Sequence, residues 1–132
     1  MENTKRVSEL QKGNHLQMFL YRAPKQNHDA IVANLKKFVP WFEKNDVGLN
    51  YYQLGSSEKM DGMEDIGAAI SAGSDEEVWM ELQYFRDRKH CDDIYAKMMT
   101  DKDLEPLGKE FFGLVSQGKN LIMGGFSLLK HD

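Results

Sequence analysis

The sequence contains little that would crosslink or anchor a fold. It has one cysteine, Cys91, so no disulfide can form within the chain, which fits a reducing compartment. No stretch approaches the roughly 20 apolar residues of a membrane-spanning helix. Residues 1–6 are polar and lack the apolar run of a secretory signal peptide. We therefore expect a soluble, cytoplasmic protein that makes no membrane contact.

Local signatures of the common enzyme classes are also missing. The sequence has no GxSxG, HExxH, GxxxxGK[ST] or GxGxxG segment. Its histidines are scattered without metal-ligand spacing, so we predict no metal site and no cofactor. One alternative stays open, because a single axial histidine is enough to hold haem, and His90 is the first candidate. The net charge of −4 disfavours nucleic acid as a partner.

The sequence does contain two similar halves, each an apolar strand, an amphipathic helix and a second apolar strand. The six predicted elements cover residues 15–22, 27–44, 47–54, 77–85, 89–99 and 120–129. The order β-α-β-β-α-β predicts an α+β, ferredoxin-like sandwich with a four-stranded antiparallel sheet. We predict a tail over residues 1–14 and one domain over residues 15–132. Because such a sheet has helices on one face, its open face needs a cover.

Three residues give the predicted limits of the helices. Asn27 is a plausible N-cap for the first helix, since its side-chain oxygen can accept free N–H groups of the first turn. Pro40 lies inside that helix and predicts a kink or a restart. Asp103 is the predicted cap of a further helix before the last strand.

Two glycine-containing stretches are less regular. Residues 55–75 read as a loop, within which residues 66–70 form either a short helix or an extra edge strand. Gly124 and Gly125 interrupt the last strand and indicate a bulge, or a close approach of another backbone or ligand.

The third predicted strand divides its side chains between two faces. An apolar face is formed by Val78, Met80, Leu82 and Tyr84, and a mixed face by Trp79, Glu81, Gln83 and Phe85. We expect the helices to cover the apolar face, which leaves the mixed face on the open side of the sheet. Three residues of the first strand join the mixed face: Gln17, Phe19 and Tyr21.

This mixed face is the candidate site. Glu81, held partly dry against Trp79, would have a raised pKa and could act as a general acid or base. A small organic ligand would be lined by Trp79, Gln83, Tyr21, Phe19 and Gln17. The alternative is that this face packs on a partner subunit, with Glu81 and Gln83 hydrogen-bonded across the interface. Cys91 is expected to be a core residue.

Several segments resemble a known family. They are Glu77-Val78, Lys97-Met98-Met99-x-Asp101 and Asn120-Leu121-Ile122-Met123-Gly124-Gly125-Phe126, with Pro40-x-Phe42 and Asp61-Gly62 in support. Together they resemble the YbaA-like family of uncharacterised bacterial proteins. The sequence departs from that family's pattern at Cys91-Asp92 and at Tyr95, so the resemblance assigns no site residue at these positions.

The resemblance implies the dimeric α/β-barrel superfamily, in which the open faces of two subunits meet, so a second copy of the chain is the expected partner. Three functions remain open. The first is a dimer that binds a small organic ligand, between sheet and helices or in the dimer barrel, or that has only a role in assembly. The second is a cofactor-independent monooxygenase or isomerase acting on an aromatic or polyketide-like substrate. The third is haem binding.

Overall fold

A computed structural model describes residues 13–55, 60–116 and 121–129. Four antiparallel strands form one sheet in the order β2-β3-β1-β4. The strands are β1 (His15–Pro24), β2 (Gly48–Gln53), β3 (Glu76–Phe85) and β4 (Leu121–Ser127). The helices are η1 (Lys25–Asn27), α2 (His28–Lys44), α3 (Ile66–Ala69), α4 (Arg88–Met99) and α5 (Glu105–Leu114). The predicted α+β ferredoxin-like fold is confirmed.

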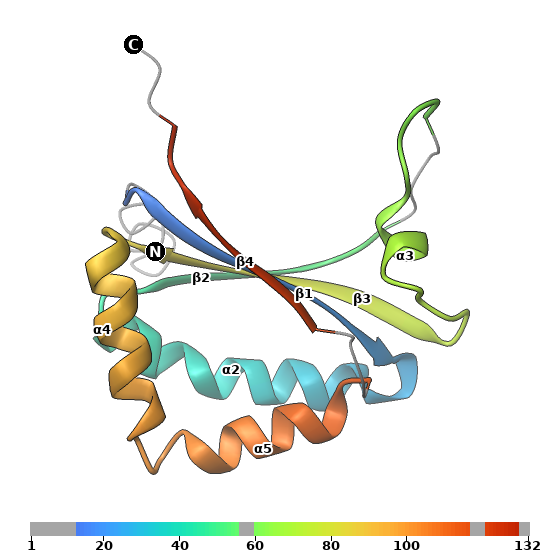
Figure 1. Ribbon diagram of the computed structural model, residues 1–132. Helices are drawn as coiled ribbons and strands as arrows, with labels where there is room; N and C mark the ends of the chain where they lie inside the picture. The colour runs from blue at the N-terminus through green and yellow to red at the C-terminus, as the bar shows by residue number, and fades with distance from the viewer. Residues whose placement is uncertain (1–12, 56–59, 117–120, 130–132) are drawn as a thin grey trace, which may run out of the picture.

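Helices α2, α4 and α5 lie on one face of the sheet, which we call the helix face (Figure 1). Helix α3 lies on the other side, over one end of the strands, and we call that side the outer face (Figure 1). Among the described residues, no helix combines the length and the apolar character that crossing a membrane requires.

The two central strands, β1 and β3, set which side chains are neighbours. In their antiparallel register Gln17 pairs with Gln83, Phe19 with Glu81 and Tyr21 with Trp79. Side chains that are directly opposite one another lie on the same face of a sheet. These six residues of the predicted mixed face therefore do lie together, as the alternation predicted.

The core shows which face they occupy. One buried cluster joins both central strands to the first helix and the end of α5, and consists of Tyr21, Ala23, Ile31, Leu35, Trp79 and Val115. A second cluster, at the other end of the sheet, consists of Phe42, Val47, Phe85, Cys91 and Ile94. Each fully buried large apolar side chain contributes about 1.5–3 kcal/mol. Trp79 and Phe85 are thus core residues of the helix face.

The predicted assignment of the two faces is therefore wrong. The mixed face of β3 packs against the helices, and its apolar face, with Met80 and Leu82, lies on the outer side. The physical reason is volume, because the helix face takes the large rings of Trp79, Phe85 and Tyr21, which have more area to bury.

Two predicted helix caps also differ from the structure. Asn27 occupies the N-cap position of α2, but its side chain makes no capping bond and donates to the Leu114 carbonyl at 2.9 Å. It therefore ties the end of α5 to the start of α2. Helix α5 begins after Leu104 without a side-chain cap, and Asp103 does not cap it. The Asp101 side chain instead accepts the N–H groups of Asp103 and Leu104, just before the helix. Helix α2 continues through Pro40 as a single helix.

The two irregular stretches are settled as follows. Ile66–Ala69 is a short helix, capped by the Asp65 side chain, and not an edge strand. Strand β4 pairs with β1 residue for residue from Leu121 to Ser127, so there is no bulge at the two glycines. Gly125 lies opposite Gln17, and a Cβ there would collide with the Gln17 side-chain oxygen. The close approach in this strand is therefore to β1 of the same chain.

Candidate functional site

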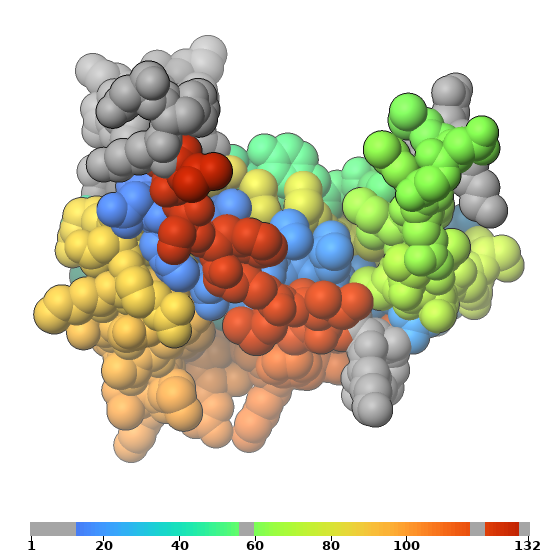
Figure 2. Space-filling view, turned by 45° about the horizontal axis from the view of Figure 1, so that its top comes forward, coloured from blue at the N-terminus to red at the C-terminus, as the bar shows by residue number. Residues whose placement is uncertain are grey.

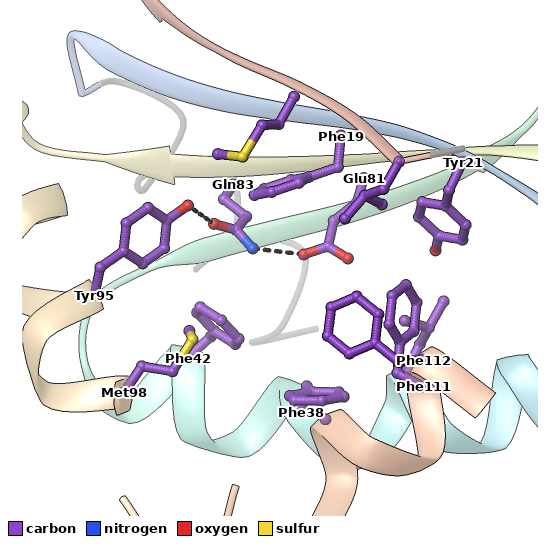
Figure 3. A pocket seen from close by; sticks show the side chains of 14 residues that line it. Phe19, Tyr21, Phe38, Phe42, Glu81, Gln83, Tyr95, Met98, Phe111 and Phe112 are labelled. Atoms are coloured by element: carbon purple, nitrogen blue, oxygen red, sulfur yellow. Dashed lines mark hydrogen bonds between the residues drawn. The ribbon is translucent and has the colours of Figure 1, made fainter. Parts of the chain in front are cut away.

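A cavity of about 310 Å³ lies between the helix face of the sheet and helices α2, α4 and α5 (Figure 3). Its wall is mainly aromatic and aliphatic. The sheet contributes Phe19, Tyr21, Leu121 and Met123, and the helices contribute Leu35, Phe38, Phe42, Tyr95, Met98, Gly108, Phe111 and Phe112. Two polar residues of β3, Glu81 and Gln83, complete it.

The cavity opens toward one edge of the sheet. The wall residues most exposed to solvent are Phe112, Leu121 and Met123, at 56%, 37% and 57%. They belong to α5 and to the edge strand β4. A ligand would therefore enter between this helix and this strand, while the deeper wall is formed by residues such as Leu35 and Phe42, each 3% exposed.

A short chain of hydrogen bonds runs along the sheet side of the cavity (Figure 3). The Tyr95 hydroxyl donates to Gln83 Oε1 at 2.5 Å, and Gln83 Nε2 donates to Glu81 Oε2 at 2.6 Å. Because the amide oxygen of Gln83 accepts from Tyr95, its NH₂ group is turned toward the carboxylate. The other oxygen of Glu81 has no hydrogen bond to any described residue and borders the cavity.

Glu81 lies in an unusually apolar position for a carboxylate. On β3 it is opposite Phe19 of one neighbouring strand and Tyr51 of the other. Burial raises the pKa of Glu81 to about 7, although the hydrogen bond from Gln83 acts in the opposite direction. A carboxyl group with a pKa near neutrality can both accept and return a proton, as general acid–base chemistry needs.

Tyr21 provides a further polar group in the wall. Its side chain is 1% exposed, and its hydroxyl has no hydrogen-bond partner among the described residues. Burial and the nearby charge of Glu81 both raise the pKa of Tyr21, so the phenol stays protonated and can donate. A buried hydroxyl without a partner is energetically costly, and it is a natural contact for a bound ligand.

The structure brings four of the six predicted site residues to the cavity: Phe19, Tyr21, Glu81 and Gln83. The other two are close by but take different roles. Gln17 is 8% exposed and lies beside His15, with its Oε1 3.3 Å from the imidazole Nε2. Trp79 belongs to the core and stacks on His28 with ring centroids 5.3 Å apart.

The residues that the sequence did not assign to the site come from the helices. They are Phe38, Phe42, Tyr95, Met98, Phe111 and Phe112. A signal was present, because Phe38, Phe42 and Phe111 follow the helical spacing that predicts a sheet-facing stripe. They were not joined to Glu81 because the helices were placed on the opposite face.

Histidine and cysteine chemistry finds little support here. His90 Nδ1 accepts the Arg86 N–H at 3.1 Å, and Nε2 lies 3.0 Å from the Asn45 carbonyl. With both ring nitrogens engaged, His90 does not fit the role of a haem ligand. Cys91 is 2% exposed and burial raises its pKa, as expected of a core thiol. Within the described ranges, no three His, Cys, Asp or Glu side chains are grouped to hold a metal ion.

Fold and cavity together define the class: a small α+β protein with a ferredoxin-like sheet and an apolar cavity under its helix face. A family model matches residues 14–113, from β1 into α5, and is described as Protein of unknown function (DUF1428). Because the match covers most of the sequence, the chain belongs to this family. No curated protein matches the sequence. The resemblance to the YbaA-like family and its dimeric barrel stays an expectation.

Proposed function

We propose that this protein binds a small, mainly apolar organic molecule in the cavity between the sheet and the helices. The observation that carries this proposal is the half-buried carboxyl group of Glu81 in a wall that is otherwise largely aromatic. The volume of about 310 Å³ suits a ligand of one or two rings. Apolar walls with a few placed polar groups are the usual form of small-molecule sites.

The polar groups would orient such a ligand. Gln83 and Tyr95 fix one oxygen of Glu81 and leave the other for a donor on the ligand. Burying a carboxyl group without full hydrogen bonding is unfavourable, so a ligand that supplies the missing bond would gain affinity. The same group, with its pKa near 7, would also suit proton transfer to or from a substrate.

Naphthalene binding tests the proposal. The amide shifts of 15N-labelled protein would be followed by NMR as naphthalene is added, and saturable shifts around Phe38, Glu81 and Phe111 are expected. Gly108 lines the cavity and has nothing within 4 Å of an added Cβ, so Gly108→Leu should fill the space and abolish binding.

Gly113 provides the matched control. It lies in the same helix, also has open space around an added Cβ, and is exposed. Gly113→Leu should therefore bind naphthalene as the wild type does. The proposal fails if naphthalene causes no saturable shifts, or if the two leucine variants bind it equally well.

We also propose that a second copy of the chain covers the outer face. Figure 2 shows β1 and β3 open to view on this face, between β4 and the segment that carries α3. Apolar side chains of the central strands face outward there, among them Leu20, Met80 and Leu82, and the edge residues Ile122 and Phe126 are each 48% exposed. Continuous apolar surface of this kind marks interaction sites.

Light scattering tests this second proposal. The wild type should have twice the mass of one chain at micromolar concentration, and Met80→Glu should reduce it to the mass of one chain because a charge would be buried at the interface. Met99→Glu is the control, since Met99 is 88% exposed on α4, far from the outer face. A wild-type protein of single-chain mass would contradict the proposal.

A further inference from the structure

We propose that the ligand is a carbonyl compound with an acidic α-hydrogen, and that Glu81 and Tyr21 together catalyse its enolisation without a cofactor. This inference rests on the proposed function and gives that site a substrate class. It assigns Glu81 as the base and the Tyr21 hydroxyl as the donor to the carbonyl oxygen. An aromatic or alicyclic ketone of one or two rings is the chemical class that the cavity fits.

The position of Tyr21 supports its role. Tyr21 lines the cavity, and its hydroxyl is buried and lacks a partner among the described residues. The ring is fixed by an edge-to-face contact with Phe111, with centroids 5.1 Å apart. A donor that is held in place before the ligand arrives can stabilise an oxyanion without reorganising.

Glu81 lies where it can act on the same ligand. Tyr21 pairs with Trp79, two residues from Glu81, so the two side chains are diagonal neighbours on adjacent strands. The Cα atoms of such positions are about 7–8 Å apart, so one ligand can contact both side chains. Figure 3 shows both side chains pointing from the sheet toward the helices.

The unpartnered hydroxyl also decides between ligand classes. An ammonium ion would pair with Glu81 and stack on the aromatic wall, but it has no acceptor for the Tyr21 hydroxyl. A ketone offers an acceptor oxygen to Tyr21 and an α-hydrogen to Glu81. The pair of polar atoms in this wall therefore favours the ketone.

The chemical step is a balanced proton transfer. The ionised carboxylate of Glu81 takes the α-proton, the C–H bond breaks, and its electron pair forms the enolate, whose oxygen accepts a hydrogen bond from Tyr21. Glu81 then returns the proton to the same carbon or to a conjugated one. The outcome is exchange or isomerisation, and neither needs an oxidant or a reductant.

Deuterium exchange tests the inference. With 2-tetralone in D₂O, loss of the α-proton signal would be followed by NMR, with the protein and in buffer alone. We expect the wild type to accelerate exchange at least tenfold, with a rate that rises with pH through a midpoint near 7. Glu81→Gln should return to the buffer rate, and Tyr21→Phe should lose most of the acceleration.

The controls separate chemistry from binding and folding. Glu81→Gln keeps every lysine, so exchange that persists in this variant would come from surface amines and would overturn the inference. Tyr21→Phe keeps the ring that packs on Phe111, and it should still bind naphthalene while binding 2-naphthol more weakly than the wild type does. A wild-type exchange rate in Tyr21→Phe would also overturn it.

The two levels of proposal can fail separately. If the wild type binds naphthalene but leaves 2-tetralone at the buffer rate, enolisation is wrong and the binding function stands. If naphthalene does not bind either, the proposed function fails together with the inference.

Discussion

The two faces of the sheet use their residues in opposite ways. The helix face combines large rings with polar side chains, and there Gln17, Glu81 and Gln83 lie beside Tyr21 and Phe85. The outer face is more uniformly apolar along β1 and β3, with Met18 and Leu20 opposite Leu82 and Met80. The more polar of the two faces is therefore the one that the helices cover.

This difference shows that polarity alone does not determine which face is buried. Three polar side chains of the helix side, Tyr95, Gln83 and Glu81, are tolerated because they bond to one another. The rings beside them supply the apolar area that holds the helices in place. The following four changes test this contrast, in order of decreasing effect.

The largest expected effect is the loss of a ring from the helix face. Phe85 is 0% exposed and contacts the rings of His90 and Tyr95. Phe85→Ala should lower the free energy of unfolding by about 3–5 kcal/mol. Leu82→Ala, on the partly exposed outer face, should cost about 1 kcal/mol in dilute protein. Urea unfolding measures both, and equal losses would remove the contrast between the faces.

The second effect is a pH dependence that comes from Glu81. Its folded-state pKa of about 7 lies above the value of an unfolded chain, so the folded state binds the proton more tightly. The stability that this provides is full below about pH 4.5 and is lost as pH rises through 7, a change of about 3 kcal/mol. Glu81→Gln cannot ionise at this position, so its free energy of unfolding should not fall in this way as pH rises.

Chemical denaturation at a series of pH values measures this pH dependence of the free energy of unfolding. The difference between wild type and Glu81→Gln isolates Glu81, because the other carboxyl groups, including Glu76 and Asp101 with their lowered pKa values, are present in both proteins. A difference that does not change between pH 5 and pH 8 would show that Glu81 ionises normally.

The third effect compares adjacent glycines that face opposite ways. An added Cβ at Gly125 meets the buried Gln17 side chain, whereas at Gly124 it meets the Phe126 ring at an ordinary 3.4 Å. Gly125→Ala should therefore cost about 1–2 kcal/mol and Gly124→Ala close to nothing. Thermal unfolding of the two variants measures both losses of stability. A larger loss in Gly124→Ala than in Gly125→Ala would contradict the assignment of Gly125 to the helix face.

The smallest effect concerns the hydrogen bond that fixes Gln83. Tyr95→Phe removes the donor to Gln83 Oε1 and should cost about 1 kcal/mol. It also frees the amide to turn away from Glu81, which would raise the pKa of Glu81 further because a bond to the ionised form is lost. Tyr52→Phe, at a ring that is 46% exposed, is the control and should change neither quantity.

Much of the fold could be predicted because its signals are local. The order of elements, the alternation in β3 and the stripes of the helices each depend on residues close together in the chain. The candidate site was predicted in part. Phe19, Tyr21, Glu81 and Gln83 share a cavity, but Trp79 has its own place in the core and Tyr95 was not recognised. Tyr95 reaches the site through its hydrogen bond to Gln83, which joins α4 to β3, and such a contact between distant elements leaves no local signal in the sequence.

By itself, the sequence determined which side chains share a face, since successive residues of a strand point to opposite sides. It did not determine which face the helices cover, because a period of two reads the same when the faces are exchanged and both faces of β3 carry apolar groups. Only the tertiary structure decided that, by packing Trp79 and Phe85 under the helices. Glu81 was carried to the same side, where it is one of the polar groups in the wall of an apolar cavity.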